Sequence, residues 1–293
     1  MLWFILATCS ALLSAVSAVL QKRILRTLDA VEFSFSVSLT IVVLSSFIPI
    51  TTDLTSVAPN ALAIIVGKSI LGASAFLLVM MSLRNGPISS ALPLLGLTPA
   101  ATALISYLIT GEGIRPLEWA GIGLMFTGAV LLDKGPGSVF MTPWRTILAS
   151  KQYYYALGAV ALFAFSSVFD KILVSGLHIK PLSVLFYQHL IYTILFFSVL
   201  VLRRYPYTHT MRRSAGEWKL IAAVAVLTLA YRFTQLEATV LAPVALVLAV
   251  KRISILYASF FGGKMFSEKR LKHKLIAAAL IVAAGFMIMR NVG

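Results

Sequence analysis

Residues 240–262 read VLAPVALVLAVKRISILYASFFG, an apolar window whose only charged residues, Lys251 and Arg252, lie near its centre. A helix of about 20 apolar residues spans the hydrocarbon core of a bilayer. In lipid only a helix or a closed barrel satisfies its own backbone, and barrel strands would alternate apolar and polar residues over about ten positions. This window does not alternate, so it predicts a membrane-spanning helix that carries two cations near mid-membrane.

The rest of the chain repeats this pattern. Nine further apolar windows lie at about 2–20, 31–50, 60–82, 88–109, 116–132, 153–174, 182–202, 217–236 and 272–289. The chain of 293 residues is 59% hydrophobic and 12% charged, whereas a soluble domain is about half apolar and a quarter charged. We therefore predict an all-α polytopic membrane protein with ten transmembrane helices and no large extramembrane domain.

The net charge of +15 comes from 25 Lys and Arg against 10 Asp and Glu. In a soluble protein this excess would suggest nucleic acid, but here most basic residues lie in short loops, where the positive-inside rule and anionic lipid favour them. We expect a lipid bilayer as the surrounding partner, and no nucleic acid. The single cysteine, Cys9, lies inside the first window, which argues against a disulfide framework or a cysteine metal cluster.

The two halves of the chain resemble each other. A shift of 156 residues places Pro87 on Pro243 and Glu112 on Glu268. Five spans per half is an odd number, so the second half must enter the membrane upside down, and such inverted repeats permit alternating access. The predicted units are a first repeat at 1–133, a connecting loop at 134–152 and a second repeat at 153–293.

Short motifs recur in both halves at matching places. They are Gly86-Pro87 and Ala242-Pro243 before one span, and Gly111-Glu112 and Ser267-Glu268 before the next. This pattern resembles the EamA-type drug/metabolite transporter superfamily over nearly the whole chain. Val250-Lys251-Arg252 also resembles the sugar-phosphate and nucleotide-sugar translocators of that superfamily, in which a Lys-Arg pair of the equivalent helix binds substrate phosphate. The resemblance implies a secondary transporter, and we expect no enzyme activity and no cofactor.

The basic residues also predict an orientation. Four of them fall on the side of the N-terminus and seventeen on the other side. The positive-inside rule then places both termini outside the cytoplasm, most simply in a bacterial plasma (inner) membrane. Family members are generally described with both termini inside, so the resemblance and the count differ, and we follow the count.

Lys251 and Arg252 are the main candidates for a binding site. A charged side chain that faces lipid at mid-membrane costs roughly 2.5–3.5 kcal/mol on insertion scales, so such residues mark functional sites by default. Neighbouring helical residues point about 100° apart, so one acid would not serve both. The planar fork of arginine suits a phosphate or a carboxylate, and lysine adds a point charge. The alternative is a structural ion pair, with Glu237 as the nearest acid in sequence.

Two further cations lie at depth, Lys68 in the third window and Arg232 in the eighth. Acids at comparable depth are few, namely Glu32, Asp170 and Glu237, and each is expected near a helix end. The interior is therefore predicted to be cationic, which favours an anionic ligand. For Lys68 and Arg232 individually, snorkelling to the interface is the alternative.

Five polar residues complete the candidate site. Tyr231 and Gln235 could hydrogen-bond the uncharged part of a solute, although an aromatic near a helix end is also a common interface anchor. Thr98 and Ser254 are repeat-mates that either contact substrate or satisfy free carbonyls. His189 is a possible proton site, and the alternative is a hydrogen bond to a neighbouring helix. No metal site is expected, since the four histidines are widely spaced.

Prolines mark irregular backbone within the predicted spans. Pro93 and Pro99 interrupt the fourth window, and Pro243 opens the ninth. Proline lacks the backbone N–H and so frees a carbonyl, and irregular backbone at this depth should line a cavity or be packed by protein. Glu112 and Glu268 are interpreted as structural carboxylates at helix starts, where they complement the helix dipole.

The favoured function is a secondary transporter that moves a small anionic metabolite, bearing phosphate or carboxylate, by alternating access, with exchange as a candidate mode. The alternative is an exporter of amino acids or amphipathic drug-like compounds. A membrane-embedded enzyme is disfavoured because the sequence lacks a Ser-His-Asp set, an H-E-x-x-H motif and a Walker loop. A structural subunit is less favoured, since charges at mid-membrane would then serve no purpose. The chain is expected to act as a monomer or homodimer.

Overall fold

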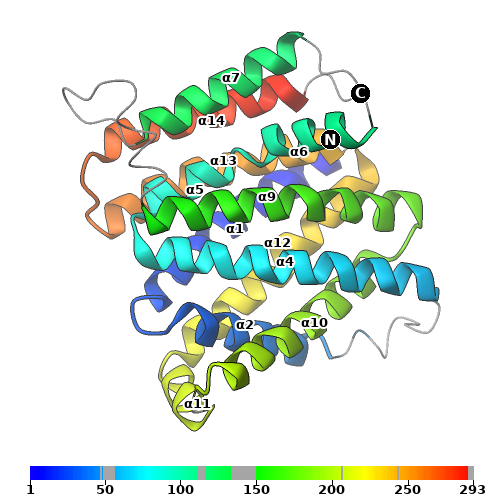
Figure 1. Cartoon of the computed structure of the whole chain (residues 1–293), viewed down its shortest axis with the longest axis vertical. Helices are drawn as coiled ribbons and strands as arrows, with labels where there is room; N and C mark the ends of the chain where they lie inside the picture. The colour runs from blue at the N-terminus through cyan, green and yellow to red at the C-terminus, as the bar shows by residue number, and fades with distance from the viewer. Residues whose placement is uncertain are drawn as a thin grey trace.

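The computed structural model describes residues 1–46, 48, 57–110, 116–132, 150–205, 207–242 and 244–289. Within these ranges the regular secondary structure is helical and contains no strand, which confirms the all-α prediction. Most helices run along one common direction, and α1 begins at the same end of the bundle at which α14 finishes (Figure 1). The helices are α1 (Leu2–Ile24), α2 (Ala30–Leu44), α4 (Pro59–Asn85), α5 (Ile88–Leu95), α6 (Thr98–Thr110), α7 (Pro116–Leu131), α9 (Lys151–Lys171), the π-helix η2 (Ile172–Gly176), α10 (Pro181–Leu202), α11 (Tyr207–Gly216), α12 (Trp218–Leu241), α13 (Val244–Met265) and α14 (Leu271–Met289).

Each predicted window corresponds to a helical segment of the described chain. The fourth window contains two helices, α5 and α6, and the sixth contains α9 together with η2. Six segments are long and apolar enough to cross a membrane by length and composition, while α2 and α7 are shorter apolar helices. The length and apolar composition of these helices support the predicted membrane character of the chain, whereas the exact count of ten spans stays a prediction.

Local sequence explains where several helices begin. Asp29 caps α2 by accepting a hydrogen bond from the backbone N–H of Val31 at 3.1 Å, and Glu32 accepts one from the backbone N–H of Asp29 at 2.8 Å. This reciprocal capping box satisfies donors that a helix start leaves free. Proline at the first position, Pro59 in α4 and Pro181 in α10, has no N–H to leave unpaired.

Helix packing follows the two-repeat pattern. The most extensive contacts join α4 to α9, α1 to α12, and α7 to α14, and α2 packs on α10. The first span of each half therefore packs on the third span of the other half. The second spans of the two halves pack on each other, and so do the fifth spans. These pairs exchange under a twofold operation, as an inverted repeat requires. Figure 1 shows α7 beside α14 at one side of the bundle and α2 beside α10 at the opposite side.

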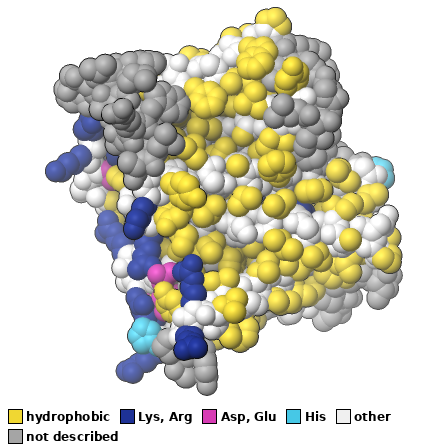
Figure 2. All heavy atoms as spheres, viewed as in Figure 1, with side chains coloured by type: hydrophobic (Ala, Val, Ile, Leu, Met, Phe, Trp, Pro, Cys, Tyr) yellow, Lys and Arg dark blue, Asp and Glu magenta, His cyan; other side chains and the backbone are white. Residues whose placement is uncertain are grey.

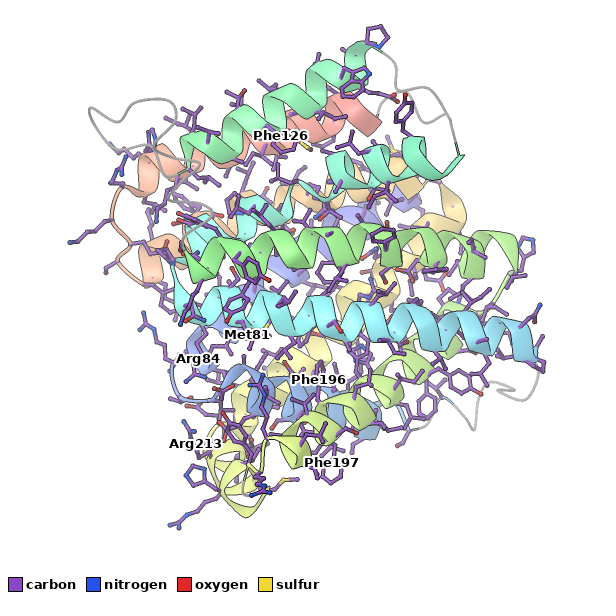
Figure 3. The ribbon with its side chains drawn as sticks, viewed as in Figure 1. Met81, Arg84, Phe126, Phe196, Phe197 and Arg213 are labelled. Carbon is purple, nitrogen blue, oxygen red and sulfur yellow. The ribbon has the colours of Figure 1, made fainter. Side chains whose placement is uncertain are left out.

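The outer surface of the bundle is apolar. On α10 the neighbouring Phe196 and Phe197 point to different sides (Figure 3): Phe196 is buried against Phe76, whereas Phe197 is exposed. In water such a surface would be unfavourable, but in lipid it is the expected one. Large exposed apolar side chains of this kind include Leu2, Phe4, Ile5, Leu12, Val16, Ile70, Ile194, Phe197, Val226, Phe261 and Ile276.

Basic side chains gather at one end of the bundle, which we call the basic end (Figure 2). Arg84 on α4 and Arg213 on α11 lie there (Figure 3), and their guanidinium groups pair with Asp29 and Glu32. The end opposite the start of α1 therefore carries the positive charge, and its assignment to the cytoplasm stays a prediction. The exposed members include Arg23, Arg26, Arg84, Lys151, Arg203, Arg204, Arg212, Arg213, Lys219, Lys264, Lys269, Arg270 and Lys272.

Glu268 caps a helix of the other repeat rather than its own. It lies in the loop before α14, and its carboxylate accepts hydrogen bonds from the backbone N–H of Ile88 at 2.6 Å and of Ser89 at 3.1 Å, and from the Ser89 hydroxyl. These donors are the free N-terminal groups of α5, which a carboxylate stabilises. The structural role expected of Glu268 is thus observed at a different helix, and Glu112 and Pro243 lie outside the described residues.

Candidate functional site

Lys68 forms a buried ion pair in the interior. It is the tenth residue of α4, and its amine donates hydrogen bonds to a carboxylate oxygen of Asp170 on α9 and, at 2.8 Å, to Oε1 of Gln188 on α10. Its side chain is only 1% exposed. Lys68 therefore does not snorkel to the interface, because its charge is satisfied inside the bundle.

Arg232 joins the same group from α12. Its Nη2 donates to Oε1 of Gln188 at 3.3 Å and lies 4.0 Å from Oδ2 of Asp170. The Arg232 and Asp170 side chains are 18% and 27% exposed, in contrast to the sealed Lys68. The amide and the carboxylate thus hold two cations together, and the Arg232–Asp170 edge of the group is the accessible one.

Asp170 and Gln188 are site residues that sequence reasoning did not place. Asp170 lies next to the end of α9 at Lys171, as expected, and the chain continues into η2, in which Leu177 N–H donates to Ile172 C=O at 2.8 Å. Single π-turns of this kind are rare and frequently occur at functional sites. The available signal was that Asp170 is the single acid of the sixth window, which a search for cation partners would have used.

Lys251 approaches the group from α13. Its amine donates to Oε1 of Gln235 and lies 4.8 Å from the centre of the Tyr231 ring, a cation–π contact. It lies within electrostatic range of Asp170 and Arg232. Because α12 continues to Leu241 and α13 begins only at Val244, Lys251 is about 10 Å from the start of its helix and not at the centre as the window predicted.

The expected structural partner of Lys251 does not appear in the described part of the chain. Neither Lys251 nor Arg252 forms an ion pair with any described acid, Glu237 included. A neutral amide and an aromatic ring satisfy Lys251 only partly, because each lacks the full charge of a carboxylate. This lysine therefore keeps attraction for a negatively charged group.

Arg252 points to a different place from its neighbour. Its Nη1 donates to the backbone carbonyl of Leu95 at 3.2 Å, and the Thr98 hydroxyl donates to the same carbonyl at 2.7 Å. Pro99 has no N–H to complete the helical bond to Leu95, so these two side chains replace it. Thr98 thus serves a freed carbonyl, one of the two roles considered for it. Arg252 Nε is buried without a partner among the described residues.

His189 and Ser254 lie apart from these contacts. The His189 ring is 5% exposed, 5.4 Å from the Tyr192 ring between centres, and neither ring nitrogen has a hydrogen-bond partner among the described residues. It lies within electrostatic range of Lys68 and Arg232. Ser254 is half-buried on α13, and no hydrogen bond between described residues joins it to Lys251.

We use the term cation cluster for the side chains that these contacts connect or bring close. The cluster brings three basic side chains together with one acidic side chain, and Arg252 is a further basic side chain beside it. Such a group can hold an anion, but it offers no set for metal binding: the described residues contain no group of three His, Cys, Asp or Glu placed to hold a metal ion. Its members are Lys68, Asp170, Gln188, Tyr231, Arg232, Gln235 and Lys251.

The fold and the cluster define a membrane protein of two inverted helical repeats with charged side chains where the halves meet. The chain belongs to the EamA-like transporter family, whose sequence profile matches residues 1–132 and 150–290. It is therefore an integral membrane protein of a family that transports small molecules. No match is found among curated proteins. A solved structure titled "Crystal structure of protein" has the same fold, with a TM-score of 0.58 and 16% identity over 95% of this chain and 96% of that one.

Proposed function

We propose that this chain is a secondary transporter that moves a small anionic metabolite, bearing phosphate or carboxylate, through the cation cluster by alternating access. The observation that carries the proposal is the state of Lys251, which has no ion pair with a described acid. An intramembrane cation without a counter-ion is costly unless a ligand supplies the charge. A phosphate or carboxylate between Lys251 and Arg232 would supply it.

The position of the cluster supports a role in alternating access. Lys68 belongs to the first repeat, whereas Asp170, Arg232 and Lys251 belong to the second. Rocking of one half against the other therefore changes the distance of Lys68 from the three charges of the second repeat. An anion at Arg232 and Lys251 would bind better in the arrangement that brings Lys68 nearer, and a ligand shifts an equilibrium only through such a difference.

The thermal stability of the purified protein tests the proposal. Inorganic phosphate should raise the melting temperature of the wild type, because a ligand that binds the folded state stabilises it by mass action. Lys251→Gln should weaken phosphate binding by about tenfold to a hundredfold, the loss expected for one charge-assisted hydrogen bond. The matched control is Lys264→Gln on the same helix, since Lys264 lies 4.5 Å from the Phe260 ring centre at the basic end.

Equal phosphate responses in wild type, Lys251→Gln and Lys264→Gln would remove the cluster as the anion site. The same screen should include unphosphorylated amino acids and amphipathic cations. A response to those compounds with none to phosphate, sulfate or carboxylates would favour the exporter alternative.

Exchange is the expected transport mode. A cluster with excess positive charge crosses the membrane less readily empty than with a bound anion. We expect phosphate uptake into proteoliposomes to be faster when phosphate is also present inside. Equal uptake with and without internal phosphate would argue against obligatory exchange.

A further inference from the structure

Asp170 is a negative group inside a cluster that we propose to bind anions, and its contacts carry an inference that rests on the proposed function. One carboxylate oxygen accepts a hydrogen bond from Lys68, and the other lies 4.0 Å from Arg232 Nη2. Lys251 lies within electrostatic range of the same carboxylate. Asp170 thus lies between the cations, in a position that a substrate anion would compete for.

The surroundings of Asp170 contain no second acid in the described chain. α5 and α6, which also pack on α9, carry no Asp, Glu, Lys, Arg or His. Every charged neighbour is a cation, so the carboxylate is the one group of the cluster whose charge opposes an incoming anion. Among the described side chains, the titratable or charged groups around it are Lys68 of α4, Tyr192 of α10, Tyr231 and Arg232 of α12, and Lys251 of α13, with His189 of α10 within electrostatic range of Lys68 and Arg232.

Two anions cannot share these cations without a cost. Like charges a few ångströms apart repel strongly in a partly buried site, and one member of such a pair tends to take up a proton. Asp170 and Arg232 are more exposed than Lys68, so we place the approach of a substrate at the edge of the cluster where Asp170 lies. Binding must therefore displace the carboxylate or neutralise it.

We propose that Asp170 is an internal competitor of the substrate and the proton-coupling residue of the transporter. When an anion binds at Arg232 and Lys251, a proton from water on the same side adds to a carboxylate oxygen of Asp170. When the anion leaves on the other side, that proton returns to water there. A divalent anion and one proton then cross together, and the loaded cluster carries one positive charge fewer than the empty one.

Sulfate is the test ligand, because its charge stays constant between about pH 5.5 and about pH 8, where phosphate changes its own. Thermal-shift titrations of the full-length protein should show wild-type sulfate affinity rising as pH falls, by about tenfold across this range, because protonated Asp170 no longer competes. Asp170→Asn should bind sulfate at least about tenfold more tightly than wild type at the upper pH and show no pH dependence.

Three further variants keep the test decisive. Asp170→Asn leaves Lys68 buried without its counter-ion, so the double variant Lys68→Gln/Asp170→Asn removes the pair together and should also bind sulfate independently of pH. Asp170→Glu retains a carboxylate and should retain the pH dependence, which a merely structural role of residue 170 does not predict. His189→Asn removes the other candidate proton site and should leave the pH dependence unchanged.

The outcomes separate this inference from the proposed function. Sulfate binding whose pH dependence survives in both Asp170→Asn and the double variant overturns the coupling role and leaves the anion site standing. Loss of the pH dependence in His189→Asn alone transfers the proton site to His189 and also overturns it. Absence of sulfate stabilisation in wild type and in Asp170→Asn at every pH overturns the anion site itself.

Discussion

A single backbone carbonyl, that of Leu95, explains the direction of Arg252. Pro99 has no backbone N–H to donate to this carbonyl, and the side chains of Arg252 and Thr98 donate to it instead. The Lys-Arg pair that the sequence presents as one feature thus divides between two surroundings, since Lys251 faces Gln235 and Tyr231. Adjacent residues of a helix point about 100° apart, so this division needs no distortion of α13.

This arrangement predicts a non-additive effect on stability. Thr98→Val or Arg252→Met alone leaves one donor on the Leu95 carbonyl and should cost about 1 kcal/mol or less. The double variant leaves that carbonyl without a donor and should cost about 1–2 kcal/mol more than the sum of the single variants. Apparent stabilities from thermal unfolding of the four proteins measure the coupling, and strict additivity would show that the carbonyl is satisfied in another way.

At the scale of the helix, close packing of α4 on α10 depends on Gly72. A Cβ atom on this residue would lie 2.2 Å from the Tyr192 hydroxyl oxygen. The Tyr192 ring cannot retreat easily, because it packs among Phe76, His189 and Phe196. The helices approach this closely only with glycine at the crossing.

Gly72→Ala should therefore destabilise the protein by about 1–3 kcal/mol, as overpacking of an interior does. Gly67→Ala is the matched control on the same helix, because its Cβ would meet nothing within 4 Å. Thermal unfolding should show no loss of stability for that control. Adding Tyr192→Phe to Gly72→Ala removes the clashing oxygen and should recover part of the loss; a Gly72→Ala protein as stable as the Gly67→Ala control would contradict this account.

The cap of α5 gives a second expectation at this scale. Glu268→Gln weakens the contacts with the N–H groups of Ile88 and Ser89 by removing the carboxylate charge, so it should lower stability by about 1 kcal/mol. Glu217→Gln is the control, since Glu217 makes only an exposed hydrogen bond with Thr27 at 3.1 Å. Thermal unfolding at matched pH compares the two, and equal losses would show that the cap does not hold α5.

At the scale of the whole molecule, the charge distribution predicts orientation. The basic end (Figure 2) lies opposite the start of α1 (Figure 1), and the positive-inside rule places that end in the cytoplasm. In a Cys9→Ser background, Leu177→Cys in the loop before α10 should react with a membrane-impermeant maleimide added to intact cells. Lys269→Cys at the basic end should react only after lysis. The reverse pattern would place the termini in the cytoplasm.

Much of the fold was predictable because the membrane constrains it. Apolar windows such as 240–262 must be helices in lipid. Prolines at matching positions of the two halves, such as Pro87 and Pro243, indicated the repeat. The ends of the helices were less predictable. α12 runs five residues beyond its window to Leu241, because an average of hydropathy over many residues does not show at which residue capping and packing end a helix.

The candidate site was predictable only as a set of charges. The residue types of Lys68, Arg232 and Lys251 marked them as unusual in apolar windows, since their cost in lipid requires a partner. The partners themselves, Asp170 and Gln188, come from helices 100 or more residues away in sequence from Lys68. Their choice depends on which helices pack together, and no local pattern contains that.

The sequence alone determined that this chain is a helical membrane protein of two inverted halves. In lipid, long apolar segments without strand alternation satisfy their backbone hydrogen bonds only as helices, and an odd number of spans per half reverses the orientation of the second half. The tertiary structure decided that Asp170 pairs with Lys68, that Lys251 has no ion pair with a described acid, and that Arg252 donates to the Leu95 carbonyl. Such pairings depend on distances of a few ångströms between helices, which only the packing of α4, α9, α12 and α13 sets.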